Sequence, residues 1–151
     1  MKTCAAALMA TLLCVAAWAS DERPNFTGVW KRGISTNNVV ENIEHHDPDL
    51  KIAFKSQFIG GSLSGGTSGS ESYTADGVER ASKSANGRET WTTVNWQGPS
   101  LVILRVTKDG YRVTVTRRTW TLSEDGLTLT KSSRTINMDG VTENTEVFLK
   151  Q

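Results

Sequence analysis

Asp-Gly pairs recur from residue 76 onward, and they constrain the fold more than any other feature of the sequence. There are four of them, at Asp76-Gly77, Asp109-Gly110, Asp125-Gly126 and Asp139-Gly140. Asp-Gly is a strong signal of a tight hairpin turn, because glycine adopts the positive φ angles that such turns need. Turns at short, regular separations are typical of an up-and-down antiparallel meander, in which each strand pairs with the next one.

The segments between the turns have the length and the two-residue period of strands. In residues 50–55, Leu50, Ile52 and Phe54 alternate with two lysines and an alanine, which gives a strand one apolar face. After residue 19, no segment has a helical period longer than a turn or two. We therefore predict an all-β domain, a single antiparallel up-and-down β-barrel of about 8–10 strands. The expected strands are residues 26–31, 39–45, 50–58, 71–74, 78–83, 88–96, 101–107, 111–122, 127–136 and 141–149.

A Gly/Ser-rich segment, residues 60–70, separates two of these strands. Such a composition loses much entropy when it is ordered and offers little to bury, so we expect a flexible surface loop. The alternative is a mobile flap over the barrel mouth. The strands on either side of Asp76-Gly77 are expected to pair as a hairpin.

The first expected strand carries Phe26, Gly28 and Trp30 on one face, which suits a crowded barrel floor. Its sequence, Phe-Thr-Gly-Val-Trp-Lys, resembles the opening Phe-x-Gly-x-Trp-Lys strand of the lipocalin and fatty-acid-binding-protein (calycin) superfamily. Two later segments, residues 96–103 and 120–130, are similar to small exported lipocalin-like bacterial proteins. The resemblance implies a barrel that closes back onto this first strand and encloses an apolar cavity.

The first 19 residues have the pattern of a secretory signal peptide. Lys2 precedes an apolar run from Ala5 to Ala17, and Ala17-Trp18-Ala19 offers small residues at a cleavage site. We expect cleavage after Ala19, a barrel domain at residues 20–151 without an integral membrane segment, and a periplasmic or secreted location. Lipoprotein processing at Cys14 is the alternative. Both cysteines, Cys4 and Cys14, precede the cleavage site, so the mature chain has no thiol for a disulfide or a nucleophile.

The charge of the chain is balanced, with 17 basic and 16 acidic residues. Nucleic-acid binding depends on a surface with an excess of basic residues, which a chain with a net charge near zero does not provide. The length suits one domain, and we expect a monomer.

Catalytic and metal-binding patterns are missing from the sequence. Residues 65–69 lack the strand-to-helix context of a nucleophile elbow. His45 and His46 point to opposite faces of a regular strand, so they are poor ligands for one ion, and we expect both to be exposed near a turn. We predict no metal, no cofactor and no catalytic residue.

Arginines inside the strands are the candidates for ligand binding. Arg105 and Arg117 interrupt apolar faces, and an arginine that points into a barrel needs an anionic partner, such as a ligand carboxylate. Outward arginines paired with strand glutamates are the alternative. Trp96 is expected to close one end of the barrel. The residues expected to line the cavity are Trp30, Phe54, Tyr73, Arg105 and Arg117.

The leading hypothesis is an exported barrel that binds a small apolar or amphipathic, lipid-like molecule without transforming it. The alternatives are a packed β-barrel interaction module and an enzyme built on the barrel.

Overall fold

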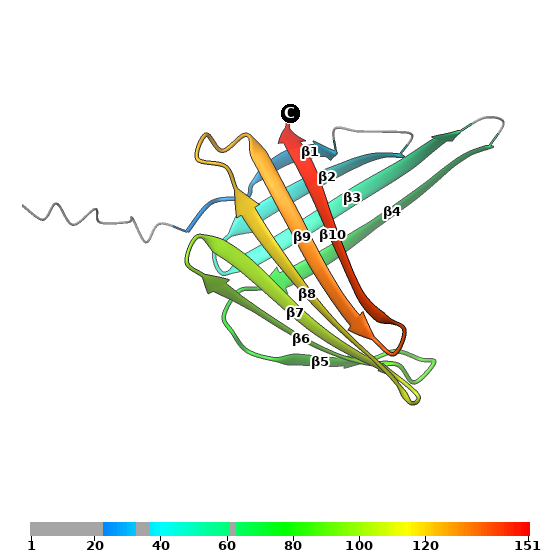
Figure 1. Ribbon diagram of the computed structural model, residues 1–151. Helices are drawn as coiled ribbons and strands as arrows, with labels where there is room; N and C mark the ends of the chain where they lie inside the picture. The colour runs from blue at the N-terminus through cyan, green and yellow to red at the C-terminus, as the bar shows by residue number, and fades with distance from the viewer. Residues whose placement is uncertain (1–22, 33–36, 61–62) are drawn as a thin grey trace, which may run out of the picture.

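The computed structural model describes residues 23–32, 37–60 and 63–151. This part of the chain consists of strands and their connections, and no helix in it is long and apolar enough to cross a membrane (Figure 1). The predicted leader, its predicted cleavage site and both cysteines lie outside the described residues. The strands are β1 (Gly28–Arg32), β2 (Asn37–His46), β3 (Asp49–Gly60), β4 (Leu63–Thr74), β5 (Arg80–Lys83), β6 (Glu89–Gln97), β7 (Ser100–Asp109), β8 (Arg112–Leu122), β9 (Thr128–Asn137) and β10 (Gly140–Lys150).

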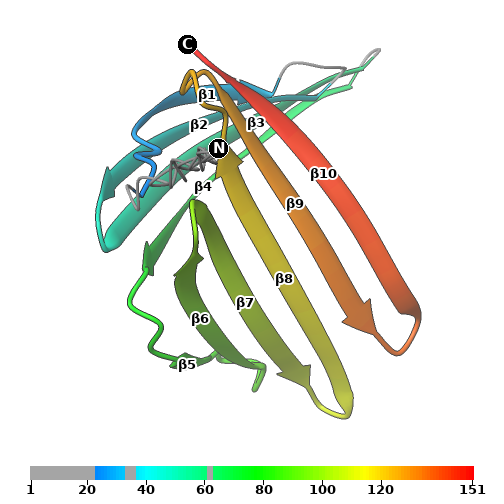
Figure 2. The same cartoon turned by 60° about the vertical axis from the view of Figure 1, so that its left-hand side comes forward.

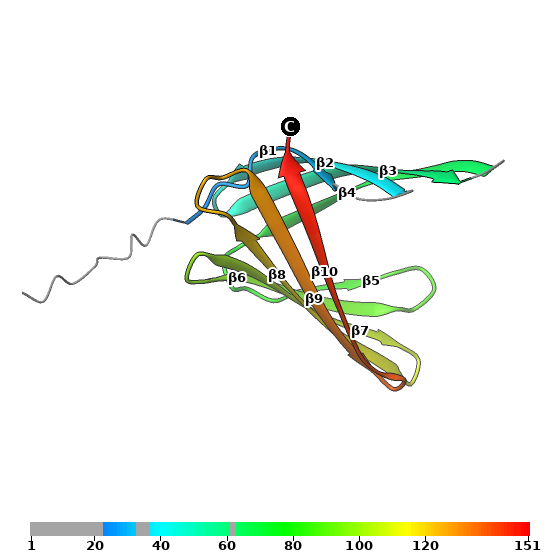
Figure 3. The ribbon, with the colours of Figure 1, turned by 45° about the horizontal axis from the view of Figure 1, so that its top comes forward.

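The ten strands form one antiparallel sheet in the order β4-β3-β2-β1-β10-β9-β8-β7-β6-β5. The first and last strands meet in its middle, where Trp30 lies opposite Lys150, so the chain does close back onto its first strand. Figure 3 shows β1–β4 as one layer over the layer that contains β5–β8. The predicted all-β meander is confirmed, but β4 and β5 are not paired, so the sheet is not strictly closed.

Three of the four Asp-Gly pairs form the predicted turns. The glycines have positive φ angles of 60° at Gly110, 70° at Gly126 and 126° at Gly140. Each turn joins two strands that pair along their length, and Figure 2 shows β6–β10 side by side in chain order.

The hairpin expected across Asp76-Gly77 is wrong. The Asp76 carboxylate binds the Arg80 guanidinium at 2.8 Å and 2.9 Å, and it also accepts from the Val78 N–H. The Gly77 N–H donates to the Val94 carbonyl at 2.8 Å. These bonds attach the connection to β5 and β6, and β4 and β5 become the two free edges of the sheet.

The Gly/Ser-rich segment is also not the loop that its composition predicts. From Leu63 onward it forms β4, which pairs with β3 residue by residue from Gly60↔Leu63 to Asp49↔Thr74. The long strand β3 offers a complete row of backbone groups, and pairing with it satisfies the polar backbone of the Gly/Ser segment. Gly69 lies opposite Phe54, and a Cβ there would come within 2.7 Å of the Phe54 ring. Glycine therefore leaves room for that ring.

The hydrophobic core fills one end of the barrel, near the β2–β3, β6–β7 and β8–β9 turns. The Trp30 indole N–H donates to the Phe26 carbonyl at 2.8 Å, and both side chains are fully buried. Trp96 stacks on Phe26 at a centroid distance of 5.8 Å, which confirms that it closes this end. We call this cluster the barrel floor; its other fully buried members include Ile43, Leu50, Leu101, Leu129 and Phe148.

Candidate ligand-binding site

Charged side chains face one another in the interior next to the barrel floor. They come from the first strands of the chain and from the last ones, and their ion pairs join these two groups of strands. Alternation places them inside, because each lies two residues from another inward-facing position of its strand. We call this group the interior charge cluster; its members are Arg32, Glu41, Glu71, Arg105, Arg118, Lys131 and Glu146.

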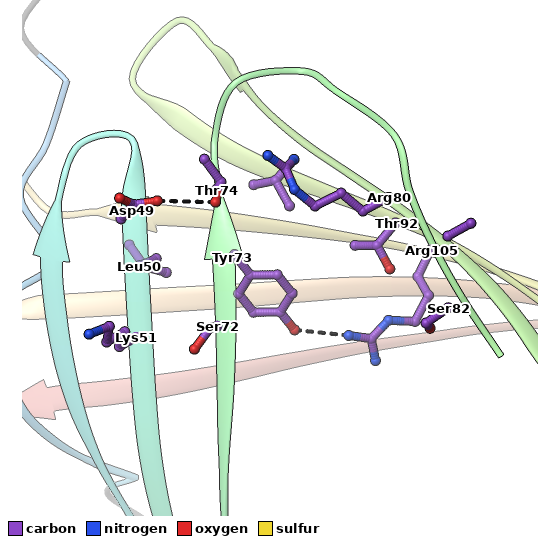
Figure 4. A pocket seen from close by; sticks show the side chains of 12 residues that line it. Asp49, Leu50, Lys51, Ser72, Tyr73, Thr74, Arg80, Ser82, Thr92 and Arg105 are labelled. Carbon is purple, nitrogen blue, oxygen red and sulfur yellow. Dashed lines mark hydrogen bonds between the residues drawn. The ribbon is translucent and has the colours of Figure 1, made fainter. Parts of the chain in front are cut away.

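A first pocket, of about 460 Å³, lies beside the unpaired edges β4 and β5, and we call it the seam pocket. Figure 4 shows Tyr73 from β4 and Arg105 from β7 pointing toward each other across it. Its apolar wall includes Leu50 and Val94. Because neither edge strand has a partner here, the pocket opens between the two ends of the sheet.

Tyr73, Arg105 and Arg118 converge on one carboxylate, that of Glu71. The Tyr73 hydroxyl donates to Glu71 Oε2 at 2.6 Å, and Arg105 Nη2 donates to the Tyr73 oxygen at 3.1 Å. The two guanidinium groups approach Glu71 less closely, at 3.9 Å for Arg105 and 3.8 Å for Arg118. Burial, together with the nearby Glu71 carboxylate, raises the pKa of Tyr73 to about 12, so its hydroxyl remains a proton donor.

Arg105 also carries a buried donor that is not satisfied. Its Nε has no hydrogen-bond partner within the described part of the chain. A buried N–H without an acceptor is costly, and it is more costly on a charged group. Arg105 therefore has one donor that a further acceptor could satisfy.

A second pocket, of about 360 Å³, lies in the interior beside Trp120 of the hydrophobic core, and we call it the inner pocket. Its apolar wall consists of Val39, Ile52, Phe54 and Trp120. Its polar wall includes two ion pairs, one between Lys131 and Glu41 and one in which Glu146 is held by Arg32. A chamber that combines apolar walls with a few placed polar groups has the chemistry of a site for a small amphipathic molecule.

The interior charge cluster is not electrically balanced. It has four cationic and three anionic side chains, and hence a net charge of +1. An excess charge in a partly buried site is unfavourable unless a counter-charge joins it. The cluster therefore favours a ligand with one negative charge.

Lys131 is the most enclosed cation of the cluster, with 11% of its side chain exposed. Its Nζ lies 3.7 Å from the centroid of the Trp120 ring and 5.0 Å from that of Phe148. Burial lowers the pKa of Lys131, and the Glu41 carboxylate opposes part of this effect.

The five residues expected to line the cavity fall in different places. Tyr73 and Arg105 line the seam pocket, and Phe54 lines the inner pocket. Trp30 belongs to the barrel floor and lines neither pocket.

Arg117 does not line the interior, which corrects the expectation for this residue. It lies on the outer, exposed face of β8 and donates to Gln97 at 2.8 Å. The next residue, Arg118, shares the inner face with the buried Trp120.

The interior carboxylates and Lys131 were missed by sequence reasoning. A signal for Glu41 exists, since it alternates with Val39 and Ile43 on an otherwise apolar face. Glu71 and Lys131 have weaker signals, because each has only one large neighbour at spacing two, Tyr73 for Glu71 and Leu129 for Lys131.

His45 is buried, with 4% of the residue exposed, so the expectation of two exposed histidines is wrong for this one. Its Nδ1 accepts the Phe26 N–H at 3.3 Å, and its ring packs near Phe26 and Trp96. Burial lowers the pKa of His45, while the Asp47 carboxylate opposes this effect. His46 is exposed as expected. In the described ranges, no three His, Cys, Asp or Glu side chains are grouped to hold a metal ion.

Known proteins resemble this chain in fold but not in sequence. No protein-family profile matches the chain, and no curated protein sequence matches it. Among solved structures, it is similar to zebrafish ileal bile acid-binding protein complexed with cholic acid, with a TM-score of 0.53 and 13% identity over 83% of this chain and 98% of that one. It is also similar to the REP1-NXSQ fatty acid transporter, with a TM-score of 0.50 and 11% identity over 83% and 95%. The fold is therefore that of an antiparallel up-and-down β-barrel, as predicted.

Proposed function

We propose that this protein is an exported carrier that binds one small amphipathic, lipid-like molecule with a single negative charge and releases it unchanged. The observation that carries the proposal is the convergence of Arg105, Arg118 and Tyr73 on Glu71 inside a cluster with a net charge of +1. The leader pattern supports export. The two similar structures support the lipid-like class of ligand, since their names refer to a bile acid and a fatty acid.

The headgroup of the ligand binds between Arg105 and Arg118. An added carboxylate there gives the buried Arg105 Nε an acceptor and brings the net charge of the cluster to zero. Guanidinium and carboxylate groups form paired, charge-assisted hydrogen bonds, which fix the orientation of the ligand as well as its affinity. Glu71 occupies this place in the free protein and moves aside when the ligand binds.

The apolar tail of the ligand extends along Ile52, Phe54 and Trp120 in the inner pocket. Apolar area removed from water contributes about 25 cal/mol per Å² to the free energy of binding. The unpaired edges β4 and β5 give the ligand a route from solvent through the seam pocket.

Calorimetric titration with matched amphiphiles tests this function. We expect dodecanoate to bind and dodecanol to bind at least about tenfold more weakly, since the alcohol lacks the charge. Arg105→Met and Arg118→Met each weaken dodecanoate binding by a similar factor, because each removes one charge-assisted partner. Arg117→Met is the matched control, because this arginine lies outside the barrel. Equal affinity for the acid and the alcohol would contradict the proposed headgroup site.

A second candidate function, an interaction module, is favoured by one feature of the outer surface. Apolar side chains lie directly opposite one another across five neighbouring strands, in the row Trp91, Val106, Val115, Ile136 and Val141. Outer faces of antiparallel sheets are normally polar. If this row joins two copies of the chain, sedimentation of the protein will show a concentration-dependent dimer that Ile136→Lys abolishes. A monomer at all concentrations rejects this candidate.

A further inference from the structure

Lys131 differs from the other lysines of the described chain in its surroundings. The others are exposed: Lys31, Lys51, Lys55, Lys83, Lys108 and Lys150. Lys131 instead places its amine at the wall of the inner pocket, over the face of Trp120 and in contact with Glu41, whose side chain is 13% exposed. The pocket thus presents an enclosed primary amine beside a carboxylate.

We propose that Lys131 condenses reversibly with amphipathic aldehydes that enter the inner pocket, and that the protein holds them as an imine. This activity goes beyond the carriage of an anionic ligand at Arg105 and Arg118. It rests on the proposed function in one respect only, that the inner pocket admits an apolar chain.

The reaction needs no partner other than the aldehyde. Glu41 accepts a proton from the Lys131 ammonium, and the free lone pair attacks the carbonyl carbon to form the C–N bond. A second proton passes from the nitrogen to the carbonyl oxygen, which becomes a hydroxyl. Glu41 then returns its proton to this hydroxyl, which leaves as water when the C–O bond breaks. The products are one protonated imine and one water molecule, Glu41 is again a carboxylate, and nothing is oxidised or reduced. Hydrolysis by the reverse path releases the aldehyde.

The surroundings of Lys131 favour each part of this sequence. Burial lowers the pKa of its ammonium, which raises the fraction of nucleophilic amine at neutral pH. The Glu41 contact supplies the acid and base at the reacting atom. Once the imine is protonated, the Trp120 ring and the Glu41 carboxylate stabilise its positive charge, as they do for the ammonium now.

The walls of the inner pocket select the kind of aldehyde. Ile52, Phe54 and Trp120 offer an apolar surface to an alkyl chain, and a short polar aldehyde gains nothing from it. We therefore expect decanal to react at Lys131 far better than acetaldehyde does.

Reductive trapping in the unmodified protein tests the proposal. The protein is incubated with decanal and cyanoborohydride at neutral pH, and the alkylated sites are mapped by peptide mass spectrometry. We expect Lys131 to be modified at least about tenfold faster than each exposed lysine, because the pocket holds the alkyl chain with its carbonyl beside this amine. The exposed lysines and the amino terminus are the internal references. Modification of Lys131 at or below the level of the exposed lysines would overturn the proposal without the need for any variant.

Two variants test the chemistry of the imine site. Lys131→Arg keeps a cation beside Glu41 and Trp120 but removes the nucleophile, so it abolishes trapping in the pocket. Glu41→Gln retains the amine but loses the proton acceptor, so trapping slows. If decanal reacts selectively at Lys131 while dodecanoate does not bind, only the anion site fails; if dodecanoate binds while decanal labels the lysines uniformly, only the imine site fails.

Discussion

Arg118 on β8 and Glu71 on β4 approach each other within 3.8 Å, although five strands lie between β4 and β8 in the order of the sheet. The contact crosses the interior and links the two halves of the barrel. It also means that Glu71 occupies the place in which an anionic headgroup is proposed to bind. Glu71 thus links the two halves of the barrel, and under the proposed function it competes with the ligand.

Glu71→Gln is therefore expected to affect stability and binding in opposite directions. Without the carboxylate, Arg105 and Arg118 lose a shared counter-charge, and the free energy of unfolding falls. The same change frees both guanidinium groups, so dodecanoate binds more tightly, by about threefold given the partial exposure of these side chains. Urea unfolding and calorimetry measure the two effects. Glu143→Gln, which alters an exposed pair with Arg134, is the control and leaves dodecanoate affinity unchanged.

Acid is expected to destabilise the barrel through His45. The pKa of His45 is lowered in the folded protein from its ordinary value of 6.5, so the unfolded chain binds a proton at a higher pH than the folded one. Its contribution to stability is therefore complete above pH 6.5 and is lost as the pH falls toward the lowered value. A protonated Nδ1 also cannot accept the Phe26 N–H.

Urea unfolding on both sides of this pH window measures the effect of His45. We expect His45→Gln to reduce the loss of stability between about pH 7.5 and pH 5, relative to the unchanged protein. His46→Gln is the matched control, because His46 is exposed and its variant should follow the unchanged protein. Identical pH profiles for the His45 variant and the unchanged protein would exclude His45 as the source.

Gly69 and Gly65, both on β4, are expected to respond differently to the same substitution. A Cβ at Gly69 meets the Phe54 ring at 2.7 Å, whereas a Cβ at Gly65 meets nothing within 4 Å. Gly65→Ala therefore stabilises the strand by about 0.5–1 kcal/mol, since alanine loses less entropy on folding. Gly69→Ala displaces Phe54, and its free energy of unfolding should fall below that of Gly65→Ala by about 1–3 kcal/mol. Equal unfolding midpoints would show that Phe54 moves at no cost.

Trp30→Ala is expected to destabilise the protein much more than Trp91→Ala does. The side chain is fully buried in the barrel floor, so its removal should cost about 3–5 kcal/mol. Trp91→Ala, on the outer face, should cost about 1 kcal/mol or less. Chemical denaturation followed by circular dichroism gives both values, and a loss at Trp30 no larger than that at Trp91 would contradict the described floor.

Much of the fold could be predicted because local residues determine it. Gly110, Gly126 and Gly140 mark their turns through a backbone conformation that is set within a few residues. Trp30 and Trp96 also suit the floor on local grounds, since bulky aromatics next to a turn close a barrel end. The Gly/Ser segment was predicted wrongly because β4 depends on its partner β3, and composition alone does not reveal a partner strand.

The candidate site was harder to predict because it depends on the register of β8 and on ion pairs between residues that are far apart in the chain. Arg117 and Arg118 are adjacent, and a shift of one residue exchanges the inner and outer faces. The buried Trp120 decides the register in favour of Arg118. The pairs Lys131–Glu41 and Arg118–Glu71 join residues that are far apart in the chain, and no local pattern brings them together.

Native mass spectrometry of the protein secreted by a bacterial host and purified without detergent tests whether the barrel carries an acidic amphiphile. We predict one additional mass per chain, from such a molecule, that disappears on denaturation. This mass is lost in Arg105→Met and Arg118→Met but retained in Arg117→Met. A bare protein mass that persists after exposure to a lipid extract and to dodecanoate would contradict the proposed carrier function and favour the interaction module with its apolar row on the outer face.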